Sequence, residues 1–483
     1  MNWKNYDKLS ILSDFYEFTM MNGYLDNNLA DQIAYFDMFF RKVPDKGGFA
    51  IACGLEEVIR YIENISFSED EIKYFKDKKI FSDKFLDYLK NFKFACDIWA
   101  VPEGSVVFPN EPILIVRGPV IQAQLLETMI LLTINHQSLI ATKAKRIVEA
   151  ADGRLVMEFG ARRAHGVDSS VLGARAAYIG GVNSTSNTLT DLEYSVPASG
   201  TMAHSWIMMF DNEYEAFKAY AKTYPRNCSL LVDTYNVLKS GIPNAIRVFD
   251  EFVKPNGYDS ISIRIDSGDL AYLTKKARKL LDEAGYEDCK IIVSNSLDEY
   301  TITDLLQQKA EIDGFGVGER LIVAKSDAVF GGVYKLVANE DKDGNIIPKI
   351  KISENVEKIT TPAFKDLYRL YDKESGKAEA DLITLKGEKV DDSKPIEIFH
   401  PIHTWKRKNL NNFRAEKRLV KIYDKGKLVY ELPKIDQIRK HAQEEVDSLW
   451  DEVKRFENPH DYFVDLSQNL WDIKNKLLNQ TSK

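Results

Sequence analysis

The feature that most constrains the fold is a series of short apolar runs in the middle third of the chain, each ending in polar residues or glycine. The runs are RLVMEFG from 154, SLLVDTYN from 229, ISIRIDSGD from 261, KIIVSNS from 290 and IDGFGVG from 312. From Asp233 to Val317, successive run ends are 33, 29 and 22 residues apart, which is room for a crossover helix. We therefore predict a parallel α/β sheet, closed into an irregular (β/α) barrel or open and doubly wound.

The segments on either side have a different rhythm. Residues 1–120 predict an N-terminal α+β domain, whose first helix begins at the N-cap Ser13 and closes at Asn22-Gly23. Bridging helices over 120–152 lead into the barrel domain at 153–335. Residues 336–483 predict a small C-terminal region with a hairpin around Asp343-Gly344, further strands and a charged helical tail, DQIRKHAQEEVDSLWDEVKRF.

Charge and cysteine content exclude several classes of protein. With 65 Lys+Arg against 73 Asp+Glu the net charge is -8, so we expect no nucleic-acid partner and no anionic membrane surface. The four cysteines include no CxxC pair, which argues against a zinc ribbon and against a disulfide framework.

The first residues lack a signal-peptide pattern, and the apolar stretch 129–134 is too short to span a membrane. We expect a cytoplasmic protein.

The segment EFGARRAHG follows the first predicted strand. Arg162 and Arg163 keep their charge at physiological pH and suit a carboxylate or phosphate ligand. A surface salt-bridge pair is the alternative. Phe159 beside them is either part of a ligand site or part of the core.

Two further segments are rich in small residues. The loop IGGVNSTSN at 179–187 would let backbone N–H groups approach an oxyanion, although such loops are common. In VPASGTMAHSW, the amphipathic pattern after Gly200 places His204 in the first turn of a helix. A neutral imidazole there can attack a phosphoryl group, and the helix end would stabilise the product. A histidine with a purely structural role remains the alternative.

Polar side chains end the following strands. In SIRIDSGDL, Arg264 and Asp266 should point to one face of a strand, with Asp269 in the loop beyond. The arginine can hold an aromatic carboxylate, while the acids can bind ribose hydroxyls or Mg²⁺. A structural Arg–Asp pair inside a barrel is the competing interpretation. Asp233 and Asn295 lie at equivalent strand ends.

The last run, DGFGVGERL, supplies Gly314, Gly316 and Gly318. Glycine loops after late strands of a barrel commonly bind phosphate through backbone amides. The position of this one favours that interpretation.

Taken together these motifs resemble the nicotinate phosphoribosyltransferase family. FGARR, SGTMAHS, LVDTYN, RIDSGDL, VSNSLDE and FGVGE followed by FGGVYKL occur in a similar order, and SDFYEFTM matches the family's N-terminal motif. The resemblance covers roughly residues 9–370. It implies a barrel of the type II phosphoribosyltransferase kind. It implies that nicotinate and 5-phosphoribosyl 1-diphosphate give nicotinate mononucleotide and diphosphate in NAD salvage. It also implies coupled ATP hydrolysis, and with it the class of C–N bond-forming ligases.

The resemblance also implies roles for individual residues. His204 looks like an autophosphorylated histidine, with Asp266 as its catalytic neighbour and Mg²⁺ as cofactor at Asp266 and Asp269. The nicotinate site would comprise Tyr16, Phe159, Thr201 and Arg264, with Tyr16 stacking on the pyridine, across the interface of a homodimer with a shared active site. The phosphoribosyl diphosphate would be bound by Arg162, Asp233, Asn295, Gly316, Gly318 and position 319. Relatives carry threonine at that last position, whereas this chain has Glu319, which would repel a phosphate unless a metal or lysine intervenes.

Other activities remain possible on the sequence alone. Nicotinamide phosphoribosyltransferase shares the architecture, but a neutral amide has less need of a guanidinium partner. The quinolinate enzyme would need more cations for two carboxylates and no phosphorylated histidine. A metal-dependent barrel lyase or aldolase would use Asp233, Asp266 and His204 as ligands or bases, and a nucleotide sensor would bind without turnover.

Overall fold

The computed structural model describes residues 9–355 and 358–481, which divide into two compact units. Unit 1 contains the described residues up to Leu139 and from Val329 onward, and unit 2 is Ile140–Ala328. The chain passes from unit 1 to unit 2 within one long helix, α6 (Glu127–Ala150).

Unit 2 is built on a six-stranded parallel sheet in the order β7-β6-β11-β10-β9-β8. The strands are β6 (Leu155–Glu158), β7 (Ser184–Thr185), β8 (Cys228–Leu231), β9 (Ile261–Ile265), β10 (Lys290–Ser294) and β11 (Gly314–Val317). The five apolar runs supply five of these strands, so the predicted parallel sheet is confirmed. Among the described residues no pairing joins β7 to β8, and closure into a full barrel stays a prediction.

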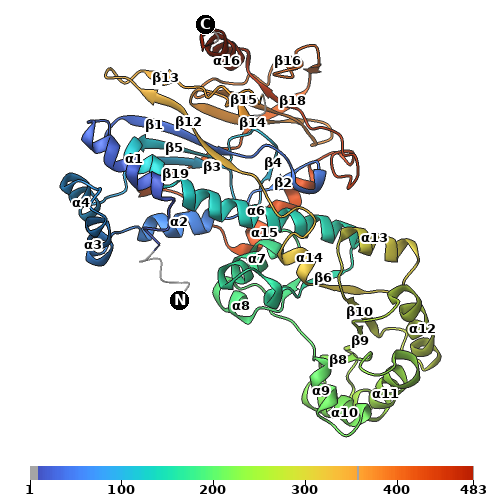
Figure 1. Cartoon of the computed structure of the whole chain (residues 1–483). Helices are drawn as coiled ribbons and strands as arrows, with labels where there is room; N and C mark the ends of the chain where they lie inside the picture. Colours follow the sequence, from blue (N-terminus) through green and yellow to red (C-terminus); the bar gives the residue numbers. More distant parts are fainter. Residues whose placement is uncertain (1–8, 356–357, 482–483) are drawn as a thin grey trace. The chain divides into compact units, whose positions relative to one another are not determined.

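Helices follow the strands of unit 2, as the spacing predicts. They are α7 (Val167–Ile179), α8 (Thr188–Tyr194), α9 (His204–Met208), α10 (Glu213–Thr223), α11 (Ile242–Val248), α12 (Leu270–Glu283), α13 (Glu299–Gln307) and α14 (Glu319–Ile322). In Figure 1, α12 lies beside β9 and β10. Burial in β9 alternates, with Ile263 and Ile265 buried and Arg264 partly exposed between them. This alternation directs Arg264 to the face opposite the isoleucines.

Unit 1 contains a seven-stranded sheet to which both ends of the chain contribute. Its order is β13 (Ile346–Pro348), β12 (Val333–Glu340), β1 (Ile33–Phe39), β5 (Leu114–Pro119), β3 (Asp97–Ala100), β19 (Val420–Asp424) and β20 (Lys427–Leu428). The predicted hairpin around Asp343-Gly344 is confirmed as the antiparallel pair β12 and β13. The C-terminal segment therefore completes a sheet that the N-terminal segment begins.

Three smaller sheets complete unit 1. They are β18 (Phe413–Lys417), β14 (Lys365–Asp372), β15 (Ala378–Leu385) and β21 (Val464–Leu466); β16 (Ile396–Phe399) with β17 (Arg407–Leu410); and β2 (Ala50–Ile51) with β4 (Val106–Val107). Its helices, besides the first part of α6, are α1 (Phe15–Asp26), α2 (Leu55–Asn64), α3 (Glu69–Asp77), α4 (Asp83–Lys90), α5 (Val120–Leu125), α15 (Ile435–Asp447) and α16 (Gln468–Thr481).

Three predicted helix boundaries are wrong. The first helix has Asp14 rather than Ser13 as N-cap, because the Ser13 hydroxyl donates to the Glu17 carboxylate instead. The same helix runs through Asn22-Gly23 to Asp26, because this glycine has helical rather than left-handed backbone. The charged tail ends as a helix at Asp447 and not at 456, and a further helix, α16, follows it.

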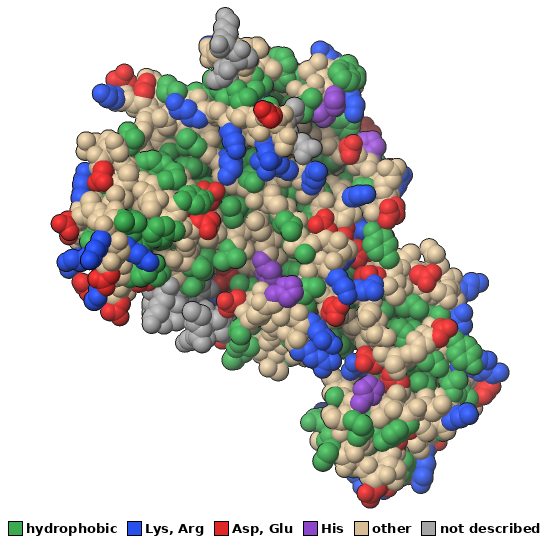
Figure 2. Space-filling view, in the orientation of Figure 1, with side chains coloured by type: hydrophobic (Ala, Val, Ile, Leu, Met, Phe, Trp, Pro, Cys, Tyr) green, Lys and Arg blue, Asp and Glu red, His purple; other side chains and the backbone are tan. Residues whose placement is uncertain are grey.

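The described surface carries charges of both signs. Acidic and basic side chains are interspersed on the face in view in Figure 2. None of the helices described, in residues 9–355 or 358–481, combines the length and apolar character that a bilayer crossing requires.

Candidate active site

Arg264 lies at the centre of a group of side chains at the carboxyl end of the unit 2 sheet. Its Nε donates to the Ser294 hydroxyl at 3.0 Å, and its Nη2 to Asp266 Oδ1 at 3.0 Å. Its Nη1 makes two longer contacts, 3.3 Å to Thr201 Oγ1 and 3.4 Å to the Met202 carbonyl. The side chain is 14% exposed, so a ligand can reach the guanidinium, and the Nη1 contacts are the weakest it would displace.

His204 begins α9, in the first turn as the sequence predicts. Its Nδ1 lies 3.1 Å from the Thr234 hydroxyl and 3.9 Å from Asp233 Oδ1, and its Nε2 lies 3.8 Å from Asp266 Oδ2. The ring is 39% exposed. One hydroxyl therefore orients an accessible imidazole between two carboxylates, an arrangement suited to a nucleophile or a proton carrier.

Asp233 joins the ends of β8 and β9. Its side chain is 1% exposed, and its Oδ2 accepts from the Asp266 backbone N–H at 2.8 Å and from the Ser267 hydroxyl at 2.6 Å. Its Oδ1 is buried and has no hydrogen-bond donor among the residues that the structure describes. A buried carboxylate oxygen without a donor is costly, so this atom has a hydrogen-bonding position that the described residues leave unfilled.

Phe159 lies beside the guanidinium. The Arg264 Cζ is 5.6 Å from the centre of the Phe159 ring, close enough for a cation–π contact. A Cβ added to Gly316 would lie 2.6 Å from the Phe159 ring, and one on Gly318 would lie 3.2 Å from the Phe159 carbonyl oxygen. Packing against Phe159 thus accounts for Gly316. Its predicted role in phosphate binding, and that of Gly318, stay predictions.

Arg162 and Arg163 are exposed on a short 3-10 helix, Ala161–Arg163, after β6. Across the described parts of the chain, neither guanidinium has an ion-pair or hydrogen-bond partner, which favours a ligand role over the salt-bridge alternative. Glu319 has a lysine partner, Lys325 Nζ at 2.6 Å, whose hydrogen bond and charge lower the pKa of the Glu319 carboxyl. This pairing partly neutralises the acid that departs from the family pattern.

The remaining predicted strand-end residues occupy the loops of the same unit. Asn295 has φ 110° and Ser296 has φ 48°, conformations that non-glycine residues rarely adopt and that cluster at functional sites. Asp269 is the N-cap of α12, where its Oδ1 accepts from the Tyr272 N–H at 3.0 Å. The predicted metal role of Asp269 and the diphosphate role of Asn295 stay predictions.

A buried carboxylate connects two of the predicted loops. Glu158 is 0% exposed; one oxygen accepts from the Gly160 N–H and the other from the Thr185 hydroxyl at 2.7 Å. Thr185 in turn is hydrogen-bonded through its backbone to Pro197 and Ser199. Burial raises the pKa of Glu158 above its usual range. Glu158 thereby fixes the FGARR turn to the loop that leads to His204.

The structure gathers six of the residues that the sequence singled out into one group. Phe159, Thr201, His204, Asp233, Arg264 and Asp266 form the group described above. Tyr16 lies on α1 in unit 1, half exposed, and burial together with the nearby Glu127 raises its pKa to about 12. Its predicted contact with the pyridine stays a prediction.

Three hydroxyls that the sequence analysis missed hold this group together. Ser294 contacts Arg264 and Asp266, Thr234 contacts His204, and Ser267 contacts Asp233. Each adjoins a residue that was identified, since Thr234 and Ser267 follow Asp233 and Asp266, and Ser294 precedes Asn295. That adjacency at strand ends is the signal that could have found them.

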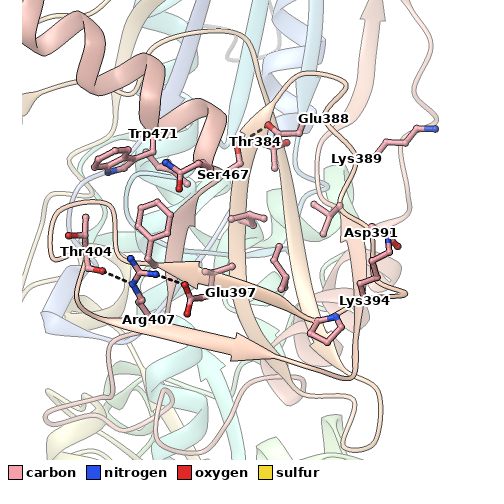
Figure 3. A pocket seen from close by; sticks show the side chains of 18 residues that line it. Thr384, Glu388, Lys389, Asp391, Lys394, Glu397, Thr404, Arg407, Ser467 and Trp471 are labelled. Carbon is pink, nitrogen blue, oxygen red and sulfur yellow. Dashed lines mark hydrogen bonds and ion pairs between the residues drawn. The ribbon is translucent and has the colours of Figure 1, made fainter.

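A cavity of about 630 Å³ in unit 1 is a separate feature. Figure 3 shows it between β15, the β16–β17 hairpin and the start of α16. Its charged rim pairs internally: Arg407 contacts Glu397, and Lys394 lies 2.9 Å from Asp391. None of the residues predicted to form the site lines this cavity, so it is not the candidate active site.

Family comparisons cover most of the chain. Residues 11–135 match the nicotinate phosphoribosyltransferase (NAPRTase) N-terminal domain, residues 155–374 match the NAPRTase family, and residues 364–474 match the NAPRTase C-terminal domain. The middle match contains the whole group around Arg264 and His204.

Individual proteins are similar over nearly their full length. The nicotinate phosphoribosyltransferase of Bacillus subtilis is 44% identical, covering 98% of this chain and 96% of its own. That of Caenorhabditis elegans is 34% identical, covering 98% and 94%. The crystal structure of human nicotinic acid phosphoribosyltransferase superposes with a TM-score of 0.84 at 28% identity, covering 96% of this chain and 99% of that one.

Proposed function

Since this chain belongs to the nicotinate phosphoribosyltransferase family, we propose that it joins nicotinate to the phosphoribosyl group of 5-phosphoribosyl 1-diphosphate. The products are nicotinate mononucleotide and diphosphate, and the step belongs to NAD salvage. The proposal rests on the residues that surround Arg264.

The observation that carries the proposal is the state of the Arg264 guanidinium. It is held at Nε and Nη2 by short contacts, while its two Nη1 contacts are long and easily replaced. A carboxylate on a pyridine ring can take the Nη1 position, with the ring near Phe159 and the Thr201 hydroxyl. A carboxamide would gain less, because it brings no charge.

The proposed bond formation needs no protein nucleophile. The pyridine nitrogen donates its lone pair to C1 of the ribose, and the bond from C1 to the diphosphate oxygen breaks with its electron pair leaving on diphosphate. The protein's part is to orient the nitrogen and stabilise the departing charge. Arg162 and Arg163, exposed and unpaired by other described residues, together with Asn295 and the Gly316–Gly318 segment, are proposed to bind the phosphates.

We propose that ATP hydrolysis is coupled through His204, which places the enzyme among the C–N bond-forming ligases. An imidazole nitrogen forms the bond to the γ-phosphorus while the bond to the bridging oxygen breaks and ADP leaves. The Thr234 hydroxyl contacts Nδ1. Asp266 Oδ2 lies beside Nε2 and can stabilise a proton on Nε2.

Mg²⁺ is the proposed cofactor, and the donor set fits it. Asp233 Oδ1 is buried without a donor in the described parts of the chain, and the Asp266 side chain, whose Oδ2 lies beside His204 Nε2, is partly exposed. Two carboxylates with substrate phosphates are a usual set for this hard cation. When bound, it would neutralise charge on the diphosphate. Asp269 uses its Oδ1 as the N-cap of α12, so it would join through its other carboxylate oxygen.

Several finer features complete the proposal. The protein is proposed to be a cytoplasmic homodimer with a shared active site, in which the half-exposed Tyr16 stacks on the pyridine. The six-stranded sheet is proposed to form part of an irregular barrel, with segment boundaries near residues 152 and 335. Nicotinamide transfer and lyase or aldolase chemistry are not favoured, because the similar proteins named above are all nicotinate enzymes.

The test is product formation by the purified full chain. Nicotinate, phosphoribosyl diphosphate and Mg²⁺ are supplied with and without ATP, and nicotinate mononucleotide is quantified for wild type and His204→Ala. We expect product from wild type, more of it with ATP, and no ATP stimulation in the variant. Failure to form nicotinate mononucleotide under either condition would refute the proposed function.

A further inference from the structure

One hydroxyl connects the two charged side chains on which the proposed function depends. The Ser294 Oγ accepts from Arg264 Nε at 3.0 Å and donates to Asp266 Oδ1 in a short hydrogen bond. Arg264 and Asp266 themselves meet at one point only, Nη2 to Oδ1 at 3.0 Å. The serine hydroxyl thus stands where a second direct contact between guanidinium and carboxylate would form.

An arginine and an aspartate side by side normally favour the two-contact, fork-to-fork pair. That arrangement would have two consequences here. It would engage both oxygens of Asp266, including Oδ2, which lies 3.8 Å from His204 Nε2. It would also neutralise the guanidinium more completely and turn its plane away from Thr201, to which Nη1 donates at 3.3 Å.

We propose that Ser294 is a positioning residue that determines specificity: its hydroxyl keeps Arg264 and Asp266 in a one-contact pair, leaving Nη1 for the substrate carboxylate and Oδ2 for His204. The inference rests on the proposed function and deepens it. Ser294 acts through these two side chains and need not touch the substrate.

The local fold holds the hydroxyl in this position. Ser294 is 4% exposed at the last residue of β10, paired with Gly316 of β11, whose position would bring a Cβ to 3.3 Å from the Ser294 Cβ. The next two residues, Asn295 and Ser296, have positive φ, so the strand ends abruptly after Ser294. Its two hydrogen bonds, from Arg264 Nε and to Asp266 Oδ1, fix the direction of the Oγ.

The inference predicts a change in selectivity. In Ser294→Ala, Arg264 Nε loses its acceptor and can pair with Asp266 Oδ2 while Nη2 keeps Oδ1, so Arg264 turns toward Asp266. We expect the KM for nicotinate to rise about tenfold or more, the usual size for losing a hydrogen bond to a charged group. We expect the preference for nicotinate over nicotinamide, as a ratio of kcat/KM, to fall by a similar factor, and the ATP stimulation to weaken.

Two variants serve as controls. Ser294→Thr keeps the hydroxyl and should retain the nicotinate KM within about threefold of wild type. Ser229→Ala removes another buried serine of the same sheet, 5% exposed, whose Oγ has no hydrogen-bond partner among the described residues. It should behave as wild type.

The experiment is steady-state kinetics with nicotinate and with nicotinamide on wild type and the three variants, alongside thermal melting. Lost selectivity in Ser294→Ala alone supports the inference. Unchanged KM and selectivity in that variant, equal impairment in Ser294→Thr or Ser229→Ala, or a lower melting temperature with selectivity intact would overturn it. If wild type forms no nicotinate mononucleotide, the proposed function is wrong. If wild type is active and Ser294→Ala has the same nicotinate KM and selectivity, only this inference is wrong.

Discussion

The two units each contain a cluster of charged side chains, and the clusters differ in how completely their members satisfy one another. In unit 1, Arg369 is 0% exposed and makes short bonds to Asp381, at 2.7 and 2.8 Å, and to Glu445, at 2.9 Å. Arg418 adds two contacts to Glu445, and the Tyr462 hydroxyl donates to Asp381. The arginine and tyrosine donors of this buried cluster all face acceptors of the protein itself, while one oxygen of Glu111, the neighbour of Asp381, is buried without a partner among the described residues.

The cluster in unit 2 is open and incompletely paired. His204 stays 3.8 and 3.9 Å from its two carboxylates, Asp233 Oδ1 has no donor among the described residues, and two Arg264 contacts exceed 3.2 Å. The difference teaches that charge alone does not identify a functional site. A network whose charges all have protein partners is structural, because breaking it leaves a buried charge unpaired. A network with unfilled hydrogen-bonding positions can still bind a ligand.

The largest predicted effect is on the stability of the closed cluster. Arg369→Met leaves Asp381 and Glu445 without their central partner, and we expect a loss of about 3–5 kcal/mol in the free energy of unfolding. The molecules that remain folded should keep their activity. Denaturant unfolding with kinetics per folded molecule checks both points, and an inactive but fully stable variant would contradict the comparison.

The next largest effect concerns the open cluster. Asp233→Asn keeps an oxygen for the Asp266 N–H and the Ser267 hydroxyl but removes the charge beside His204. We expect kcat to fall about a hundredfold, a loss typical of one electrostatic group at a reacting centre, with little change in melting temperature. The contrast with Arg369→Met is then between lost activity and lost stability. A lower melting temperature of Asp233→Asn with unchanged kcat would contradict this contrast.

A smaller effect is expected from the glycine under Phe159. In Gly316→Ala the added Cβ would lie 2.6 Å from the ring, so the ring must move, at a cost of about 1–3 kcal/mol. The KM for nicotinate should rise with it. Gly23→Ala is the control, because nothing lies within 4 Å of its added Cβ on helix α1, and it should be neutral or stabilising. Equal melting temperatures for Gly316→Ala and wild type would contradict the claim that Gly316 packs tightly against Phe159.

The smallest effect is a pH dependence in unit 1. Burial raises the pKa of Glu17 from 4.5 to about 7, so its stabilising contribution is present below pH 4.5 and is lost as the pH rises through 7. Glu17→Gln removes this titration. The melting temperature of the variant relative to wild type should therefore increase between pH 6 and pH 8. A difference that stays constant over that range would mean that Glu17 does not titrate there.

Periodicity and strand-end polarity predicted the parallel sheet and most of the candidate site. Arg264 and Asp266 were expected on one face because strands alternate with a period of two, and the 3.0 Å contact agrees. Asp233 follows an apolar run, and the amphipathic pattern after Gly200 predicts His204 in the first turn of a helix. These patterns involve residues close together in the sequence, so they can be recognised without a structure.

What the sequence did not reveal depends on contacts between distant segments. Ser294, Thr234 and Ser267 looked like ordinary loop hydroxyls until their partners were known. The packing of Gly316 against Phe159, more than 150 residues earlier, cannot be read from spacing. The sequence does not predict that Arg369 is buried, because an isolated charged residue in a Lys-rich segment normally indicates an exposed surface.

The central claim is that the open cluster selects a carboxylate through Arg264. The most direct test is to let nicotinate and nicotinamide compete for wild type and Arg264→Gln, which retains hydrogen-bond donors but not the charge. We predict that wild type converts nicotinate in strong preference, and that the variant loses at least about tenfold of this preference while melting as wild type does. A variant that still prefers nicotinate as strongly as wild type would contradict the account.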